Sequence, residues 1–103
     1  MKRLNVKEID PTKTYYAVCV GCIEEIQITG VQQPKFTYEN KYGEQEGFLE
    51  DAGIEYDNES YIHSLNFVCR SREEAEQLVN SSDYKRRLQE HLDFWKYFDH
   101  WYV

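Results

Sequence analysis

The sequence has few of the features that mark secreted, membrane-spanning or metal-binding proteins. Its three cysteines are an odd number without the spacing of a disulfide framework, which favours a reducing, cytoplasmic compartment. No stretch approaches the roughly 18 consecutive apolar residues of a transmembrane helix. No apolar run follows the basic start of the chain, as it does in a signal peptide. We therefore expect a soluble protein that does not bind a membrane.

Motifs of common enzyme sites are also missing. No glycine-rich loop ends in the Lys-Ser/Thr of a phosphate-binding loop, and no serine occupies a nucleophile elbow. Cys19 and Cys22 have the spacing of zinc and redox motifs, but His63 and Cys69 are too far apart in sequence to form a second closely spaced pair. We predict no catalytic residues, no metal and no cofactor, with Cys19 and Cys69 as small core residues. A zinc or redox role for Cys19 and Cys22 is the third alternative.

What the chain does contain is a large number of aromatic rings. Aromatic residues make up 16% of the 103 residues and leucine is scarce, so rings must supply much of the buried apolar area. A chain of this length is expected to form a single domain, residues 1–103.

The order of local patterns predicts an α+β fold. Residues 1–13 are expected to be an N-terminal arm, ending in a turn at Asp10-Pro11. Strands are predicted at 14–20, which is apolar on both faces, and at 23–29, where Ile26 and Ile28 alternate with polar residues. Further strands are predicted at 35–39, with Phe36 and Tyr38 in phase, and at 61–69, and one or two helical turns at 44–52. Ser71 and Glu74 have the spacing of a capping box, which predicts a helix over 71–79, and a second helix follows from residue 82. We expect a small antiparallel sheet of three to four strands with the two C-terminal helices packed on one face.

The net charge of −7 is concentrated in one segment. Residues 39–60 are predicted to be an acidic surface excursion, pinned to the body by Phe48, Leu49 and Ile54, in which Lys41 is the one base. Its eight acids are Glu39, Glu44, Glu46, Glu50, Asp51, Glu55, Asp57 and Glu59. The rest of the chain is neutral. An acidic balance argues against direct binding to nucleic acid or to anionic membranes, because both require cationic surface.

Residues 82–102 have a wide apolar face at helical spacing, which predicts a helix covered by the sheet along its length. That face consists of Tyr84, Leu88, His91, Leu92, Trp95, Phe98 and Tyr102. His91 is expected to be buried or half-buried and hydrogen-bonded to one backbone or side-chain acceptor. Phe94, Tyr97 and Trp101 lie outside the face. Rings beside charges are typical of binding hot spots, and a helix buried on two sides or a self-dimer explains them equally well.

The first turn of this helix carries Lys85, Arg86 and Arg87, which oppose the helix dipole. Their placement predicts a counter-charge nearby, and the acidic segment of the same chain or of a second copy is the simplest candidate. Arg70 and Arg72 are expected to join them.

These patterns lead to two hypotheses from different classes. The first is a non-catalytic protein-interaction module, of the kind that inhibits or assists a partner, which docks its acidic segment on a basic, nucleic-acid-binding surface of a protein. Its partner-binding residues are Glu44, Glu46, Glu50, Asp51, Glu55, Asp57, Phe94, Tyr97 and Trp101. The alternative is an oligomeric small-molecule-binding protein that gathers an anionic, nucleotide-like ligand. Its anion-binding residues are Arg70, Arg72, Lys85, Arg86 and Arg87.

Overall fold

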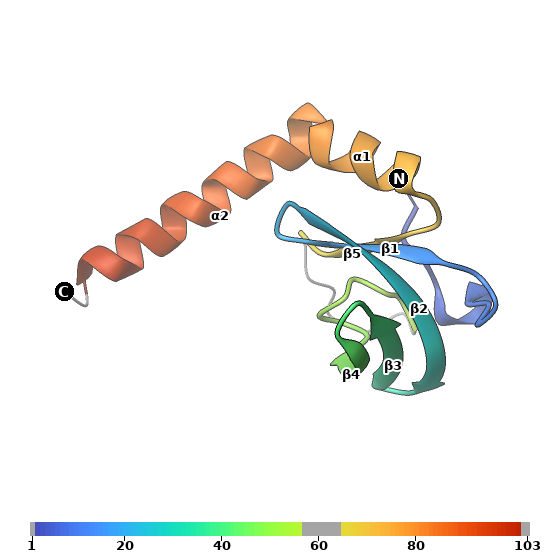
Figure 1. The fold of residues 1–103 in the computed structure, drawn as a ribbon. Helices are drawn as coiled ribbons and strands as arrows, with labels where there is room; N and C mark the ends of the chain where they lie inside the picture. The colour runs from blue at the N-terminus through green and yellow to red at the C-terminus, as the bar shows by residue number, and fades with distance from the viewer. Residues whose placement is uncertain (1, 57–64, 102–103) are drawn as a thin grey trace.

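The fold is α+β, with a five-stranded antiparallel sheet followed by two helices (Figure 1). The computed structural model describes residues 2–56 and 65–101, with the side chains of 98–101 left out. The strands are β1 (Tyr15–Cys19), β2 (Cys22–Gln32), β3 (Lys35–Asn40), β4 (Gly43–Phe48) and β5 (Phe67–Cys69), in the sheet order β4-β3-β2-β1-β5. The helices are α1 (Arg72–Asn80) and α2 (Ser82–Trp101), and a 3-10 turn, η1 (Val6–Glu8), precedes the sheet.

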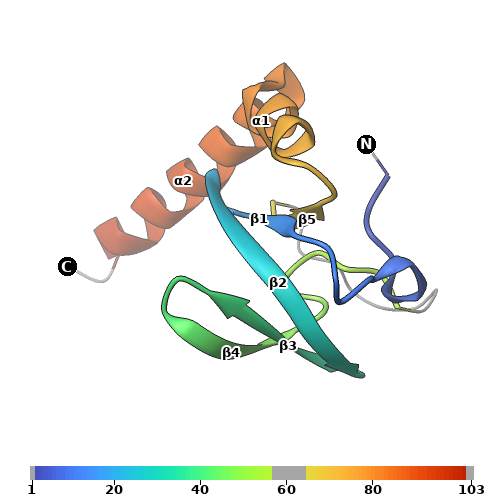
Figure 2. The same cartoon turned by 45° about the vertical axis from the view of Figure 1, so that its right-hand side comes forward.

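Strand β2 belongs to two parts of the sheet. Its first half pairs with β1, from Cys22 opposite Cys19 to Ile26 opposite Tyr15, and its second half pairs with β3, from Gln27 opposite Glu39 onward. A register shift between Ile28 and Gly30 marks a bulge, which bends the strand and increases its twist. The β3–β4 hairpin therefore extends from the far half of β2 (Figure 2).

Each face of the sheet carries its own cluster of buried side chains. On one face, Ile26, Ile28, Phe36 and Val68 pack with residues of the N-terminal arm and of the segment after β4. On the other face, Val18, Phe67 and Cys69 pack under α1 and the start of α2. Apolar residues at successive positions of β1 and β5 are thereby buried on opposite sides, and for β1 the run at 14–20 predicted this.

The N-terminal arm is part of the first core. Leu4 is 1% exposed, and the arm runs beside residue 55: the Val6 amide donates to the Glu55 carbonyl at 2.9 Å, and the Glu55 amide donates to the Leu4 carbonyl at 2.9 Å. Leu49 and Ile54 are fully buried beside it. The segment that carries the acids is thus pinned at these two positions, whereas Phe48 is 48% exposed.

Helix α1 begins where the sequence predicts. The Ser71 hydroxyl accepts from the Glu74 amide at 3.1 Å, as in the first half of a capping box. Helix α2 is anchored by Tyr84, which is 3% exposed. Its hydroxyl donates to the Leu65 carbonyl at 2.7 Å and accepts from the Gly21 amide at 2.9 Å.

Beyond its first two turns, α2 extends away from the body (Figures 1 and 2). Leu88 is half-buried, but Leu92 is 44% and Trp95 is 52% exposed. The expectation that the sheet covers the whole apolar face is wrong for these two residues. Gly21, at the tip of the β1–β2 turn, lies against Leu88, so the sheet ends where α2 continues.

Two strand predictions need correction. The sheet has five strands rather than three to four, because Gly43–Phe48 forms a strand where helical turns were expected. Gly43 adopts φ +101° after a two-residue turn, and the residues that follow pair with β3 in order. The strand predicted at 61–69 is seen as Phe67–Cys69, and 61–64 lie outside the described residues. Across the described ranges, no helix is both long and apolar enough to cross a membrane.

We expect Tyr84→Phe to lower the free energy of unfolding by about 1–3 kcal/mol, because a buried carbonyl and an amide lose their shared partner. Chemical denaturation monitored by circular dichroism measures this change. Tyr42→Phe is the matched control, since Tyr42 is 75% exposed, and its effect should stay within about 0.5 kcal/mol. Equal stability of both variants would show that the Tyr84 hydroxyl does not hold α2.

Candidate functional site

The outer face of the β2–β4 part of the sheet gathers carboxylates. Glu25, Glu39, Glu44 and Glu46 are exposed, and the strand registers place all four on the same side of the sheet. We call these four residues the acidic face. The helix-covered core contains no described residue of β3 or β4, so α1 leaves this part of the sheet uncovered.

Charge on the acidic face is only partly compensated. Lys35 Nζ lies 3.1 Å from a Glu46 carboxylate oxygen, and Lys35 is the one cation among the strand residues of this face. Glu39 and Glu44 are direct cross-strand partners. Like charges at directly opposed positions destabilise a strand pair, and a cation bound from outside would relieve that repulsion.

The remaining predicted acids lie after β4. The Glu50 carboxylate accepts a short hydrogen bond from the Tyr56 hydroxyl, so it has a structural partner. Asp51 is exposed, and Glu55 is half-buried beside the N-terminal arm. Asp57 lies outside the described residues. Within the predicted acidic segment, Glu44 and Glu46 therefore lie on the β3–β4 hairpin. Glu50 and Glu55 lie after β4, where Glu50 bonds to Tyr56 and Glu55 pairs with the N-terminal arm.

A cavity of about 390 Å³ opens on the concave face of the sheet, the side that carries Ile26 and Phe36, and Glu46 of the acidic face is also among its lining residues. It is lined by strand residues and by Asp51, Ala52 and Asn66; the strand residues are Ala17, Val18, Cys19, Glu24, Ile26, Phe36, Tyr38, Glu46, Gly47, Phe48, Phe67 and Val68. The Asn66 amide nitrogen donates to the Asp51 carbonyl at 2.7 Å and fixes one wall. Burial, followed by the negative charge of Glu24, raises the pKa of Tyr38 at the opposite wall.

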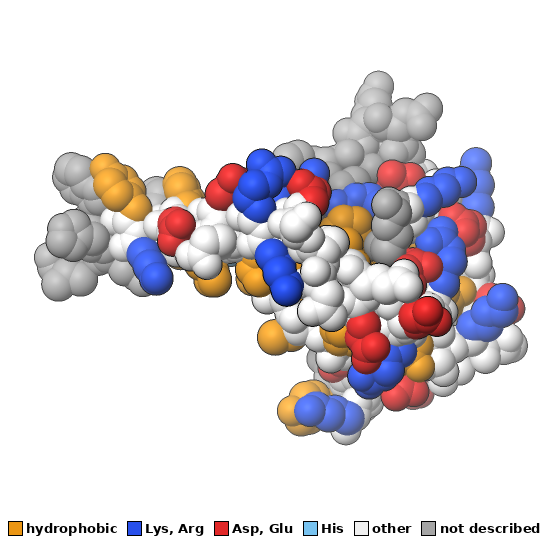
Figure 3. Space-filling model, turned by 90° about the horizontal axis from the view of Figure 1, so that it is seen from above, with side chains coloured by type: hydrophobic (Ala, Val, Ile, Leu, Met, Phe, Trp, Pro, Cys, Tyr) orange, Lys and Arg blue, Asp and Glu red, His pale blue; other side chains and the backbone are white. Residues whose placement is uncertain are grey.

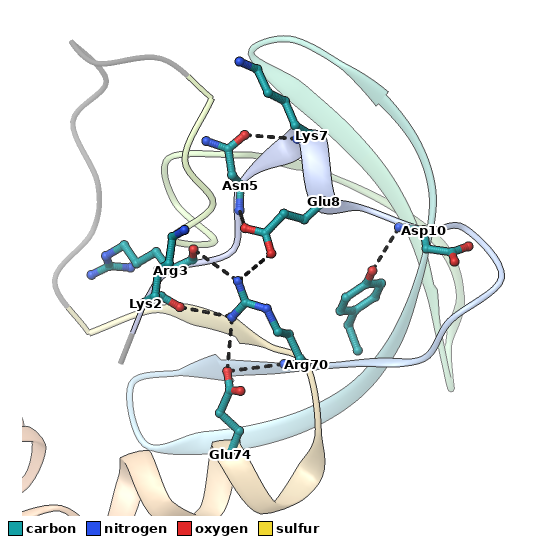
Figure 4. Close-up of polar contacts among 9 residues, drawn as sticks. Lys2, Arg3, Asn5, Lys7, Glu8, Asp10, Arg70 and Glu74 are labelled. Atoms are coloured by element: carbon teal, nitrogen blue, oxygen red, sulfur yellow. Dashed lines mark hydrogen bonds and ion pairs between the residues drawn. The ribbon is translucent and has the colours of Figure 1, made fainter.

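Arg70 has a structural role in the fold. Its guanidinium donates to the Lys2 carbonyl at 3.1 Å and pairs with the Glu8 carboxylate at 2.8 Å and with Glu74 at 3.5 Å (Figure 4). The hydrogen bond from Arg70 lowers the pKa of the Glu8 carboxyl group. Arg70 therefore holds the N-terminal arm against β5 and α1.

The other predicted cations have local partners on the helices. Arg72 pairs with Glu76 at 3.7 Å and lies over the Tyr16 ring. On α2, Arg86 and Arg87 pair with Asp83 at 2.7 and 3.2 Å. The described ion pairs of these arginines are thus made with helix acids and not with the acidic segment. Lys85 is exposed on the same turn.

The projecting part of α2 presents aromatic rings. Phe94 is 55% and Tyr97 is 60% exposed, and hydrophobic side chains are visible along this part of the helix (Figure 3). His91 is half-buried, as expected, and its imidazole accepts from the Trp95 indole N–H at 3.0 Å, whereas the sequence predicted that it would donate to an acceptor. The side chain of Trp101 lies outside the described part of the structure.

The cysteines form no metal cluster with other residues of the described ranges. Cys19 and Cys22 are exposed and face each other across the β1–β2 pair, so the expected burial of Cys19 is wrong. Cys69 is buried as expected, and burial raises its pKa to about 12. His63 lies outside the described residues.

Comparison with known proteins adds no relative. No protein-family model, no curated protein and no solved structure matches this chain.

Sequence reasoning missed the cavity and two of its residues, Glu24 and Tyr38. Tyr38 was noted for its phase with Phe36, but Glu24 precedes the clear alternation of β2 and carried no signal of its own. The glycine at position 47, in the middle of an edge strand, was a usable signal because such glycines mark close approach of another group.

In the native protein, a thiol reagent at about pH 8 should modify Cys19 and Cys22 and leave Cys69 unmodified. The raised pKa keeps Cys69 protonated, and burial blocks access to it. Mass spectrometry counts the modified thiols before and after unfolding in denaturant, with Cys69→Ala as the control that removes the third site. Rapid labelling of Cys69 in the native state would contradict the packing beneath α1.

Proposed function

We propose that this protein is a non-catalytic interaction module that binds a basic surface of a partner protein through its acidic face. The observation that carries the proposal is the uncovered row of Glu25, Glu39, Glu44 and Glu46 on the β2–β4 part of the sheet. A partner that presents lysine and arginine would replace the repulsion between Glu39 and Glu44 with attraction.

The charge distribution supports a protein partner rather than a nucleic acid. Arg70, Arg72, Arg86 and Arg87 pair with acids of this chain that lie outside the acidic face, whereas three acids of the acidic face have no cation beside them on the same strands. A negatively charged surface repels phosphate groups and attracts basic protein surfaces of the kind that bind nucleic acid. The proposed role is therefore that of an inhibitor or accessory protein that competes for such a surface.

Helix α2 adds a second contact region to the proposal. The exposed rings of Phe94 and Tyr97 offer rigid apolar area at low entropic cost, which complements the steering effect of the carboxylates. The alternative of an anion-binding site at Arg70, Arg72 and the cations of α2 receives less support, because Arg70 is engaged with the N-terminal arm.

The test uses short peptides rich in lysine and arginine, with neutral peptides of equal length for comparison. Affinity measured by calorimetry for the basic peptides should fall about tenfold or more between about 0.05 M and about 0.5 M salt, because screening weakens exposed charge pairs. The triple variant Glu39→Gln, Glu44→Gln and Glu46→Gln should lose a similar factor at low salt.

The matched control is Glu73→Gln, Glu76→Gln and Glu90→Gln, which removes the same charge from exposed helix positions. Its affinity should stay within about threefold of the unchanged protein, because screening limits the reach of surface charges. Equal losses in both triple variants would mean that net charge alone governs binding, and the acidic face would no longer be the site.

A further inference from the structure

The cavity on the concave face has an apolar floor and an aromatic wall. Ala17, Ile26 and Val68 form the floor, and the rings of Phe36 and Tyr38 stack with their centroids 5.2 Å apart. A cavity of about 390 Å³ with mostly apolar walls is in the range of sites that bind a small group.

Gly47 of β4 packs closely against the two rings. A Cβ atom at this position would lie 3.2 Å from Cε1 of Phe36 and 3.5 Å from Cε1 of Tyr38. The backbone of Gly47 is not in the left-handed region, so the close packing of the rings, and not the backbone conformation, disfavours a side chain at this position. β4 is also the end strand of the sheet, so this opening lies at an edge that a partner can approach.

The charged residues that line the cavity are acidic. Glu24 and Asp51 are acidic residues of the lining, Glu46 lines it from β4 while its carboxylate pairs with Lys35, and no lysine or arginine is among the described residues that line the cavity. The Asn40 amide donates to Glu24 Oε1 at 2.7 Å, which orients this carboxylate and leaves its second oxygen for another donor.

We propose that the cavity receives an arginine side chain of the partner protein. This inference rests on the proposed function and specifies the residue that the partner inserts. The aliphatic stem of arginine packs on the apolar floor, its planar guanidinium stacks on the half-buried Tyr38 ring, and its N–H groups donate to Glu24. Arginine is preferred to lysine here because it combines stacking with paired hydrogen bonds.

The probe for the cavity is butylguanidinium, which carries the stem and head of an arginine side chain, and n-butylurea is its neutral counterpart. Titration followed by amide chemical shifts should place butylguanidinium at Ala17, Tyr38 and Gly47, with n-butylurea binding about tenfold more weakly or worse. Butylammonium should also bind more weakly than butylguanidinium. Equal shifts from all three compounds would overturn the proposal.

Two neighbouring residues provide a matched pair of variants. Glu24 lines the cavity, whereas Glu25 points to the opposite face of β2. Glu24→Gln should weaken binding of butylguanidinium about tenfold or more, and Glu25→Gln should leave it unchanged. Gly47→Ala should weaken it as well by crowding Phe36. An unchanged affinity in Glu24→Gln would overturn the proposal, even if Gly47→Ala fails to fold.

The same variants separate this inference from the proposed function. If basic peptides bind and depend on Glu44 and Glu46 but butylguanidinium does not bind the cavity, the inference fails and the interaction module remains. If butylguanidinium binds but no arginine-containing peptide does, the assignment of a partner's arginine is overturned. Peptide affinity that falls both in Glu24→Gln and on replacement of one arginine by citrulline supports the proposal.

Discussion

The position of α2 depends on one buried hydroxyl group. Tyr84 joins three segments that are distant in sequence: the β1–β2 turn through Gly21, the chain before β5 through Leu65, and the start of α2 itself. The turn is held in a demanding conformation, since Val20 has φ +46° and a β-branched residue rarely adopts that region. The Val20 and Gly21 amides both donate to side chains, Asn66 and Tyr84, and these contacts fix the turn.

The ion pairs of Arg70 and of the helix arginines lie apart from the acidic face. Arg70 connects the arm, β5 and α1 through hydrogen bonds to backbone carbonyls and ion pairs with two carboxylates. On α2, Arg86 and Arg87 form ion pairs with Asp83 within one helical turn. Surface ion pairs of this kind contribute little to the free energy of unfolding, but each one reduces the net positive charge at its position. On the acidic face, by contrast, Lys35 is the one cation among the strand residues, and Glu24 and Asp51 are acidic residues of the cavity lining. The proposed recognition of a basic partner follows from this separation.

Local patterns were sufficient for the elements whose signal lies within a few residues. The apolar run of β1, the alternation of Ile26 and Ile28, and the Ser71 cap are all seen. β4 was missed because its alternation is between glutamates and small or polar residues, so no apolar side chain marks the inward face. The cavity could not be found from sequence, since Glu24, Tyr38 and Gly47 come from three strands and meet only through the sheet registers.

The division of β2 explains why the acidic face and the cavity occur together. Because β1 pairs with the first half of β2 and β3 with the second, α1 covers the β5–β1 part and leaves the outer side of the β3–β4 hairpin exposed. The bulge between Ile28 and Gly30 adds twist to β2, and twist turns the hairpin toward the concave side. β4 and β5 then line one cavity although they stand at opposite ends of the strand order. A partner that approaches the edge of β4 would therefore meet carboxylates on the outer side and an aromatic cavity on the inner side.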